Sequence, residues 1–307
     1  MVVPQRKMAL NESATIFWLI IPVVAILLIL ATVILQDPLA FNKFVSIKEG
    51  PPPPPLLIAS SRLDVASLIG RIPYKPVPEA LYAVEPALKF HLTIEEGRGN
   101  CSNLVFGIAY YLDQHGIDYQ IIHVLKKEDF LHGVGHVLIR VPYTYKGESR
   151  VGLVDVLEGG LPLQSGHLMS LGDLANDVSG DVSILSLNPA TDAWTPYYGK
   201  ALKNTVVGYM TADEVNRYMD FIHRIYFPLG SLMAEKYLYD GASILLGFYP
   251  KIYVASLQET FGAEFPQQHF YVSVLWAFRI LGLLLPVLLV ACSVLRYREI
   301  RDGPSSG

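Results

Sequence analysis

The sequence predicts an α+β domain with an antiparallel sheet, flanked by two transmembrane helices. Three observations indicate this architecture. Hydrophobic residues make up 51% of the 307-residue chain and charged residues only 17%, whereas globular domains are about 25% charged. One long apolar run lies near each end of the chain. Between these runs, a helical pattern is followed by strand patterns and turn signals.

The first apolar run covers residues 14–35, "ATIFWLIIPVVAILLILATVIL", and contains no charged residue. It is long enough to cross a hydrocarbon core, which takes roughly 20 helical residues. Pro22 interrupts it, but membrane helices tolerate proline. A signal peptide would have a shorter apolar core and a small-residue cleavage site, and "LQDPLAF" offers no such site. We therefore expect an uncleaved anchor after a short tail, residues 1–13.

The second apolar run covers residues 271–295, "YVSVLWAFRILGLLLPVLLVACSVL". It contains Arg279, whose long side chain can reach the membrane interface when it lies near the end of a span. The alternative is a buried core helix, but apolar runs of this length are typical of membrane spans.

Two spans place both termini on the same side of the membrane. The tail of residues 296–307 carries three arginines, which favours the cytoplasmic side. The basic residues around the first span do not decide its orientation. We expect a two-pass protein of the bacterial inner or cytoplasmic membrane, with residues 58–268 forming an extracytoplasmic domain.

Residues 36–57 read as a proline-rich linker between the first span and this domain. Five consecutive prolines, Pro51 to Pro55, favour an extended polyproline II segment. A stiff spacer explains them, and a binding site for a proline-reading module is the alternative.

The middle of the domain has a clear order of elements. Residues 101–115 have apolar residues at helical spacing, with Asn100 as a good N-cap and Gly116 where a helix commonly ends. Three strands are expected after this helix, the last two joined by a turn at Lys146-Gly147. These strands cover residues 118–125, 136–145 and 150–160, and residues 126–135 form a loop.

The rest of the domain is less regular. A short helix is expected at residues 166–177 and a strand at 181–187. Residues 210–227 predict an amphipathic helix opened by a capping box from Thr211 to Glu214. Residues 239–257 are rich in tyrosine and apolar residues, which indicates a buried helix or a segment on the membrane surface.

Cys101 is a candidate nucleophile because it begins the predicted helix. The first N–H groups of a helix lack intrahelical partners, and the helix dipole favours negative charge there, so a thiolate is stabilised. The preceding Gly97-Arg98-Gly99-Asn100 turn lets backbone N–H groups approach a substrate closely. An oxyanion formed by attack of Cys101 would meet its own backbone N–H. A small buried residue with no reactivity is the alternative reading.

A cysteine nucleophile needs a base, and the base needs a group that orients it. His136 begins the second predicted strand, about ten residues before Gly147, and Asp155 follows Gly147 by about eight. In an antiparallel pair joined by this turn, the two residues can lie opposite each other, within a register error of one or two. Asp155 would then hold the imidazole tautomer while His136 takes the thiol proton.

The stretches "GNCSNLVFGIAYYLDQHGIDYQIIHV", "HVLIRVPY" and "VGLVDV" resemble the core of the transglutaminase-like superfamily. The resemblance covers residues 95–160, about a fifth of the chain. It implies a papain-like fold with a Cys-His-Asp triad formed by Cys101, His136 and Asp155. The family usually has a tryptophan soon after its histidine and a proline after its aspartate, and neither is present here. Because some members have lost catalysis, these departures leave an inactive binding or scaffold module open.

Other site types are less well supported. A metal site would draw on the histidines that are close in sequence, which are His115, His123, His132, His136 and His167. Two glycines lie between His132 and His136, which argues against a shared helix face. Glu158, Gly160 and Arg98 are candidates for lining a cleft. No phosphate loop, dinucleotide fingerprint or G-x-S-x-G elbow is present. We expect no metal and no cofactor, and the net charge of -4 argues against a nucleic-acid partner.

Two functions from different classes follow from these patterns. The first is a thiol acyl transferase, or an amidase or peptidase, acting on a peptide or envelope substrate at the cell envelope. The second is a catalytically inactive assembly module of a membrane complex. Its membrane-protein partners would contact the span with Arg279 and the region Phe221–Leu257, because an arginine within a span commonly meets a polar partner.

Overall fold

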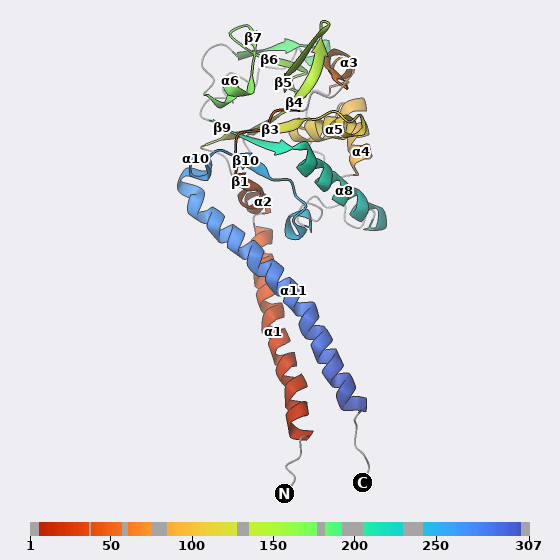
Figure 1. Ribbon diagram of the computed structural model, residues 1–307, viewed down its shortest axis with the longest axis vertical. Helices are drawn as coiled ribbons and strands as arrows, with labels where there is room; N and C mark the ends of the chain where they lie inside the picture. Colours follow the sequence, from red (N-terminus) through yellow and green to blue (C-terminus); the bar gives the residue numbers. More distant parts are fainter. Residues whose placement is uncertain are drawn as a thin grey trace. The chain divides into compact units, whose positions relative to one another are not determined.

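The computed structural model describes residues 6–36, 38–56, 61–74, 85–127, 135–176, 182–191, 205–229 and 242–301. Contacts divide the chain into two compact units. One consists of Met1–Phe41 and Gln267–Gly307, and the other of Asn42–Pro266. The chain is a mixed α+β protein with a mostly antiparallel sheet and two long apolar helices (Figure 1).

The first unit contains the two apolar helices, α1 (Arg6–Gln36) and α11 (Phe265–Arg301). The stretches Thr15–Ile34 and Leu257–Arg298, with mean hydropathies of 3.0 and 2.4, are long and apolar enough to cross a membrane. Large apolar side chains such as Trp18, Leu28 and Leu283 are exposed on these helices. Exposed apolar residues of this size suit a lipid environment. The prediction of two candidate membrane-spanning helices is confirmed.

The main sheet of the second unit has seven strands in the order β1-β10-β9-β3-β4-β2, with β5 also paired to β4. The β1–β10 and β2–β4 pairs are parallel, and the other pairs are antiparallel. A second sheet has the order β7-β6-β8. The strands are β1 (Ile47–Glu49), β2 (Leu63–Asp64), β3 (Gln120–Lys126), β4 (Gly135–Tyr145), β5 (Glu148–Val154), β6 (Gly160–Gln164), β7 (His167–Leu168), β8 (Val182–Ser186), β9 (Thr205–Thr211) and β10 (Ile252–Val254).

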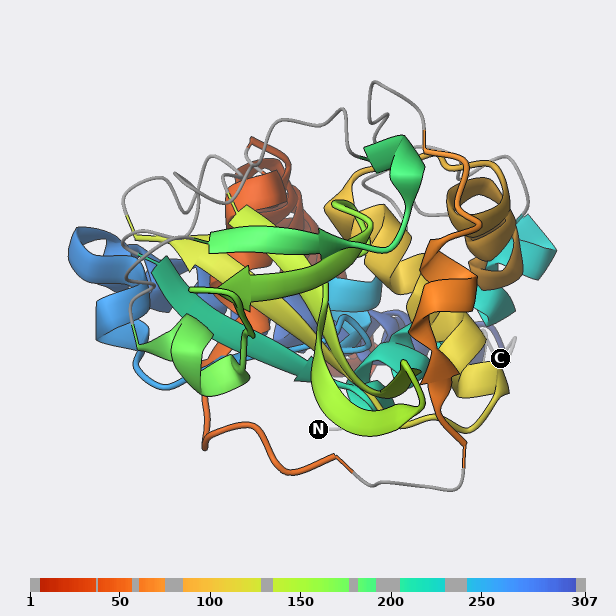
Figure 2. The same ribbon diagram turned by 90° about the horizontal axis from the view of Figure 1, so that it is seen from above.

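Short helices surround the sheets, and α5 and α8 are the longer ones of the second unit (Figure 2). Contacts join α5 to α4, to β4 and to α8. The remaining helices are α2 (Pro38–Ser46), α3 (Val65–Ile69), α4 (Pro86–Phe90), the π-helix η1 (His91–Glu95), α5 (Cys101–Gln114), α6 (Leu171–Ala175), the 3-10 helix η3 (Pro189–Thr191), α8 (Ala212–Leu229), α10 (Leu257–Phe261) and the 3-10 helix η5 (Gly262–Glu264).

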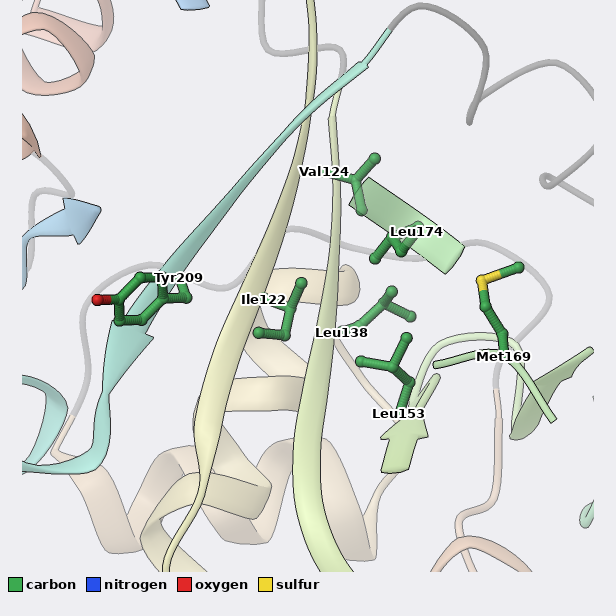
Figure 3. Packing of buried hydrophobic residues seen from close by; sticks show 7 residues of the cluster. All are labelled: Ile122, Val124, Leu138, Leu153, Met169, Leu174 and Tyr209. Carbon is green, nitrogen blue, oxygen red and sulfur yellow. The ribbon is translucent and has the colours of Figure 1, made fainter. Parts of the chain in front are cut away.

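One apolar cluster joins the main sheet to the segment that carries β7 and α6 (Figure 3). Alternate residues of β3 point into it, as expected for a strand whose side chains alternate between two faces. Burial of these side chains is the main stabilising contribution from this side of the sheet. The cluster contains Ile122, Val124, Leu138, Leu153, Met169, Leu174 and Tyr209.

Helix α5 begins and ends where the sequence predicts. The Asn100 side chain accepts from the backbone N–H of Asn103 at 3.0 Å, and the Asn103 side chain accepts from that of Asn100 at 3.2 Å. At the other end Gly116 has φ +61, and the N–H of Ile117 donates to the carbonyl of Leu112 at 2.9 Å. This pattern is a Schellman motif, which satisfies the last carbonyls of the helix.

The proline-rich segment is part of the folded domain and not a free spacer. Residues 36–57 include α2 and β1, and β1 pairs with β10. The carbonyl of Pro51 accepts from the Tyr209 hydroxyl at 3.0 Å, and that of Pro54 accepts from the Gln120 amide at 2.8 Å. Proline has no backbone N–H, so the backbone of consecutive prolines can only accept hydrogen bonds from side chains of the sheet.

Several predicted elements need correction. The segment 239–257, expected to be a buried helix or a surface segment, is helical at residues 242–246 but also contains the strand β10. Strand β9 lies unpredicted at the centre of the sheet. Gly208 in β9 reads as a strand breaker, but a Cβ there would lie 2.6 Å from Ile252 Cγ2, so close packing against β10 requires glycine. The predicted helix at 166–177 is divided into β7 and α6.

The predicted capping box at the start of α8 is only half realised. The backbone N–H of Glu214 lies 3.4 Å from the Thr211 hydroxyl oxygen. The Glu214 carboxylate instead accepts from the backbone N–H of Lys251 at 2.7 Å and from the Tyr253 hydroxyl at 3.0 Å. It therefore ties α8 to β10. The expected loop at 126–135 lies mostly outside the described residues, as does His132.

Candidate active site

Cys101 occupies the first helical position of α5 and is half-buried. Helix geometry leaves the backbone N–H groups of the first turn without intrahelical acceptors, so they point toward the space beyond the helix end. Gly97 and Gly99 in the preceding turn have φ +66 and +110, which other residues rarely adopt. A Cβ at Gly97 would overlap the carbonyl oxygen of Pro73, so the turn packs directly against residues 72–74.

His136 and Asp155 form a buried pair. His136 lies near the start of β4 and is 3% exposed, and Asp155 is fully buried. The Nε2 atom of His136 lies 2.5 Å from Oδ2 of Asp155. Burial of a carboxylate is costly unless it is paired and hydrogen-bonded, and this contact supplies the charge partner.

The position of Asp155 differs from the prediction. It lies one residue beyond β5 and forms an isolated antiparallel bridge with Gly160, with backbone hydrogen bonds of 2.9 and 3.0 Å. The register of β4 and β5 pairs Ile139 with Val154. Continued by one residue, this register places Leu138, and not His136, opposite Asp155. The pair is therefore diagonal, which side chains on one face of a sheet can span.

The turn from Asp155 to Gly160 fixes the aspartate. Its Oδ1 atom accepts from the backbone N–H of Glu158 at 2.9 Å, while Oδ2 faces His136. The Tyr74 hydroxyl donates to the carbonyl of Val156 in the same turn. Both carboxylate oxygens and both backbone groups of Asp155 thus have partners, which leaves the side chain little freedom to turn away from His136.

Cys101 and His136 also interact with each other. Burial by itself lowers the pKa of His136, but the charge of Asp155, the hydrogen bond with Asp155, and the hydrogen bond and charge interaction with Cys101 raise it to about 10. The structure therefore brings together Cys101, His136 and Asp155, with the histidine in the middle.

Two further groups lie around this trio. Glu158 is only 7% exposed, and burial, the charge of Asp155 and the opposing charge of His136 together give its carboxyl a pKa raised to about 7. Burial, with the charges of Asp155 and Glu158, raises the pKa of the Tyr74 hydroxyl far above its usual value. The sequence marks Glu158 only as a loop residue beside glycines, and it gives no signal for Tyr74, 82 residues from Val156.

Other sequence candidates lie in different surroundings. Arg98 is within 3.8 Å of Glu96, and His167 is exposed on β7. Burial lowers the pKa of His123 in β3 to about 4, and its Nε2 atom has no hydrogen-bond partner among the described residues. The His115 ring stacks on that of Tyr111 at 4.0 Å. Across the described part of the chain, no three His, Cys, Asp or Glu residues form a group suited to a metal ion.

The fold and the site together define an α+β protein with two candidate membrane-spanning helices and a buried His-Asp pair that contacts a helix-terminal cysteine. No family model, curated protein or solved structure matches this chain. Function therefore has to be argued from the site itself.

Proposed function

We propose that this protein is a membrane-anchored thiol acyl transferase or hydrolase, with Cys101 as nucleophile, His136 as general base and acid, and Asp155 as the residue that orients His136. The observation that carries the proposal is that His136 is hydrogen-bonded to Asp155 and also interacts with Cys101. A nucleophile, its base and an orienting carboxylate in this order are the parts that acyl transfer requires.

The chemistry follows from these positions. In the resting ion pair His136 has already taken the thiol proton, and the Cys101 thiolate attacks the carbonyl carbon of an amide or ester. The oxyanion that forms meets the backbone N–H of Cys101 at the start of α5, which stabilises it. His136 then gives its proton to the leaving amine or alcohol as the C–N or C–O bond breaks. Water or an acceptor amine then attacks the carbonyl carbon of the thioester, and His136 takes a proton from it. The C–S bond breaks, the acid or amide product leaves, and the Cys101 thiolate is restored beside the protonated His136.

The resemblance to the transglutaminase-like superfamily is part of this proposal. It is supported by the order α5, β3, β4, β5 and by the antiparallel pairing of β3, β4 and β5. The residues that follow His136 and Asp155 depart from the family pattern, which favours a divergent member. A peptide or another amide at the cell envelope is the substrate class that suits a domain attached to a membrane.

Reactivity of Cys101 tests the proposal without a known substrate. The chain has two cysteines, so a Cys292→Ala variant of the full chain reports on Cys101 alone. We expect its alkylation rate with iodoacetamide to change no more than about threefold between pH 8 and pH 6, because the thiolate is held as an ion pair with His136. An ordinary thiol, with a pKa near 8.5, loses reactivity by roughly 80-fold over the same range.

A fall in the alkylation rate of roughly 80-fold from pH 8 to pH 6, as for an ordinary thiol, would contradict the enzyme proposal. The buried polar trio would then be a structural feature, and the alternative function as an assembly module of a membrane complex would stand. The Cys292→Ala variant without iodoacetamide serves as the control for spontaneous oxidation at each pH.

The side of the membrane on which the α+β domain lies is tested separately. We propose that the α+β domain is extracytoplasmic, because the arginines after the second span favour the cytoplasmic side. Alkaline phosphatase, which is active only outside the cytoplasm, should be active when fused after Gly160 and inactive when fused after Gly307. The opposite pair of activities would reverse the topology.

A further inference from the structure

The carboxyl group of Glu158 is not used in the chemistry above, yet it belongs to the turn that carries Asp155. Its backbone N–H donates to Oδ1 of Asp155 at 2.9 Å, and the residue is only 7% exposed. This hydrogen bond fixes the backbone of Glu158 beside the Asp155 carboxylate. The charges of Asp155 and His136 both act on its carboxyl, and the carboxyl in turn acts on Tyr74. A flexible surface glutamate would have none of these constraints.

We propose that Glu158 is a fourth member of the site: its carboxyl holds an exchangeable proton beside the His136–Asp155 pair and sets how strongly His136 holds its own proton. This inference rests on the proposed function. Glu158 acts through His136 and is therefore a positioning residue, not a catalytic one. No oxidation or bond formation at Glu158 is involved, only loss and gain of a proton.

The charges around Glu158 give the direction of the effect. Asp155 is a negative neighbour and disfavours ionisation of Glu158, as does burial, whereas His136 as an imidazolium favours it. Tyr74 stays neutral because its pKa is raised. The Glu158 carboxyl, with a pKa of about 7, is thus protonated at pH 6 and ionised at pH 8.

Ionised Glu158 adds a negative charge to a site that already holds Asp155 and the Cys101 thiolate. This charge makes the imidazolium of His136 hold its proton more tightly and makes the thiolate more basic. A more basic thiolate attacks faster, with a Brønsted coefficient of about 0.4–0.5, so a rise of one unit in its basicity gives about a threefold faster reaction. Proton donation by His136 to a leaving group becomes weaker over the same pH range.

The experiment compares alkylation of Cys101 by iodoacetamide from pH 5.5 to pH 9 in the Cys292→Ala chain and in the same chain with Glu158→Gln. In the chain with Cys292→Ala alone, the alkylation rate of Cys101 should rise about two- to threefold with increasing pH, centred near pH 7. The Glu158→Gln protein, whose amide mimics the protonated carboxyl, should show no rise there. Glu148→Gln, at the exposed end of the β4–β5 hairpin, is the matched control and should keep the rise in alkylation rate near pH 7.

A rise near pH 7 that persists in Glu158→Gln would overturn the inference and leave the proposed function standing. A steady tenfold loss of rate per pH unit in the unsubstituted site would instead contradict the proposed function. Infrared difference spectra between pH 6 and pH 8 test the proton directly in either case. They should show loss of a protonated carboxyl band that Glu158→Gln lacks, and a spectrum without this band in the unsubstituted protein would also overturn the inference.

Discussion

Replacement of His136 by alanine should return Cys101 to the behaviour of an ordinary thiol. In the Cys292→Ala chain, the alkylation rate of Cys101 at pH 6 should fall to roughly one eightieth of the rate at pH 8, as expected for a thiol with a pKa near 8.5. The reason is that, in the proposed function, the imidazole that interacts with Cys101 accepts the thiol proton and pairs with the thiolate. Rates measured by mass spectrometry of the alkylated chain check this result.

The control is His167→Ala, which removes an exposed histidine on β7 and should leave the flat profile unchanged. His136→Gln is the second variant, because glutamine retains polar atoms in the buried position and is easier to accommodate. Circular dichroism shows whether each variant is folded. If a folded His136 variant keeps the flat profile, His136 does not control the thiol, and the proposed roles of all three residues are wrong.

Replacement of Asp155 by alanine should have the largest effect on stability. It leaves the imidazole of His136 without its carboxylate partner and the N–H of Glu158 without its acceptor, both in a buried environment. Removal of one partner of a buried ion pair costs about 3–5 kcal/mol. For a domain of this size that corresponds to a fall in the melting temperature of about 6–20 °C, measured by circular dichroism on the full chain in detergent.

The cost of Asp155→Ala should depend on pH in a defined direction. Because the pKa of His136 is raised to about 10 and the unfolded value is about 6.5, its paired form stabilises the folded state fully below pH 6.5. This contribution declines as the pH rises toward 10. The difference in melting temperature between the two proteins should therefore be larger at pH 6 than at pH 9.5.

Asp155→Asn separates the two roles of the side chain. Its carbonyl oxygen can still accept from the Glu158 N–H, but its amide carries no charge, so we expect it to recover part of the lost stability and to reduce the pH dependence. A melting temperature of Asp155→Ala within about 2 °C of the unsubstituted protein, a change that corresponds to less than about 1 kcal/mol, would show that the His136–Asp155 pair contributes little.

Features with local signals could be predicted from the sequence. The two candidate membrane-spanning helices follow from apolar length alone, since an uninterrupted apolar run can satisfy its backbone in lipid only as a helix. The bounds of α5 follow from Asn100 and Gly116, whose capping effects act within four residues. The alternation in β4 and the Lys146-Gly147 turn, with φ +49 and +79, likewise concern neighbouring residues.

The tertiary structure decided the features that depend on residues far apart in the chain. β9 lies between β10 and β3, and β10 packs closely against Gly208. Pro51 and Pro54 are held by side chains from three strands. No local pattern records such approaches, because pairing of distant segments is set by what each can bury against the other.

For the candidate site, the sequence determined which residue types were available: a cysteine at a helix start, a histidine at a strand start and an aspartate after the next strand. Their catalytic roles remain a prediction. Only the tertiary structure placed Asp155 in the turn after β5, gave both of its oxygens partners, and put Glu158 and Tyr74 beside it. The physical reason is that burial and neighbouring charge, which govern the protonation of these groups, arise only when segments distant in sequence close around them.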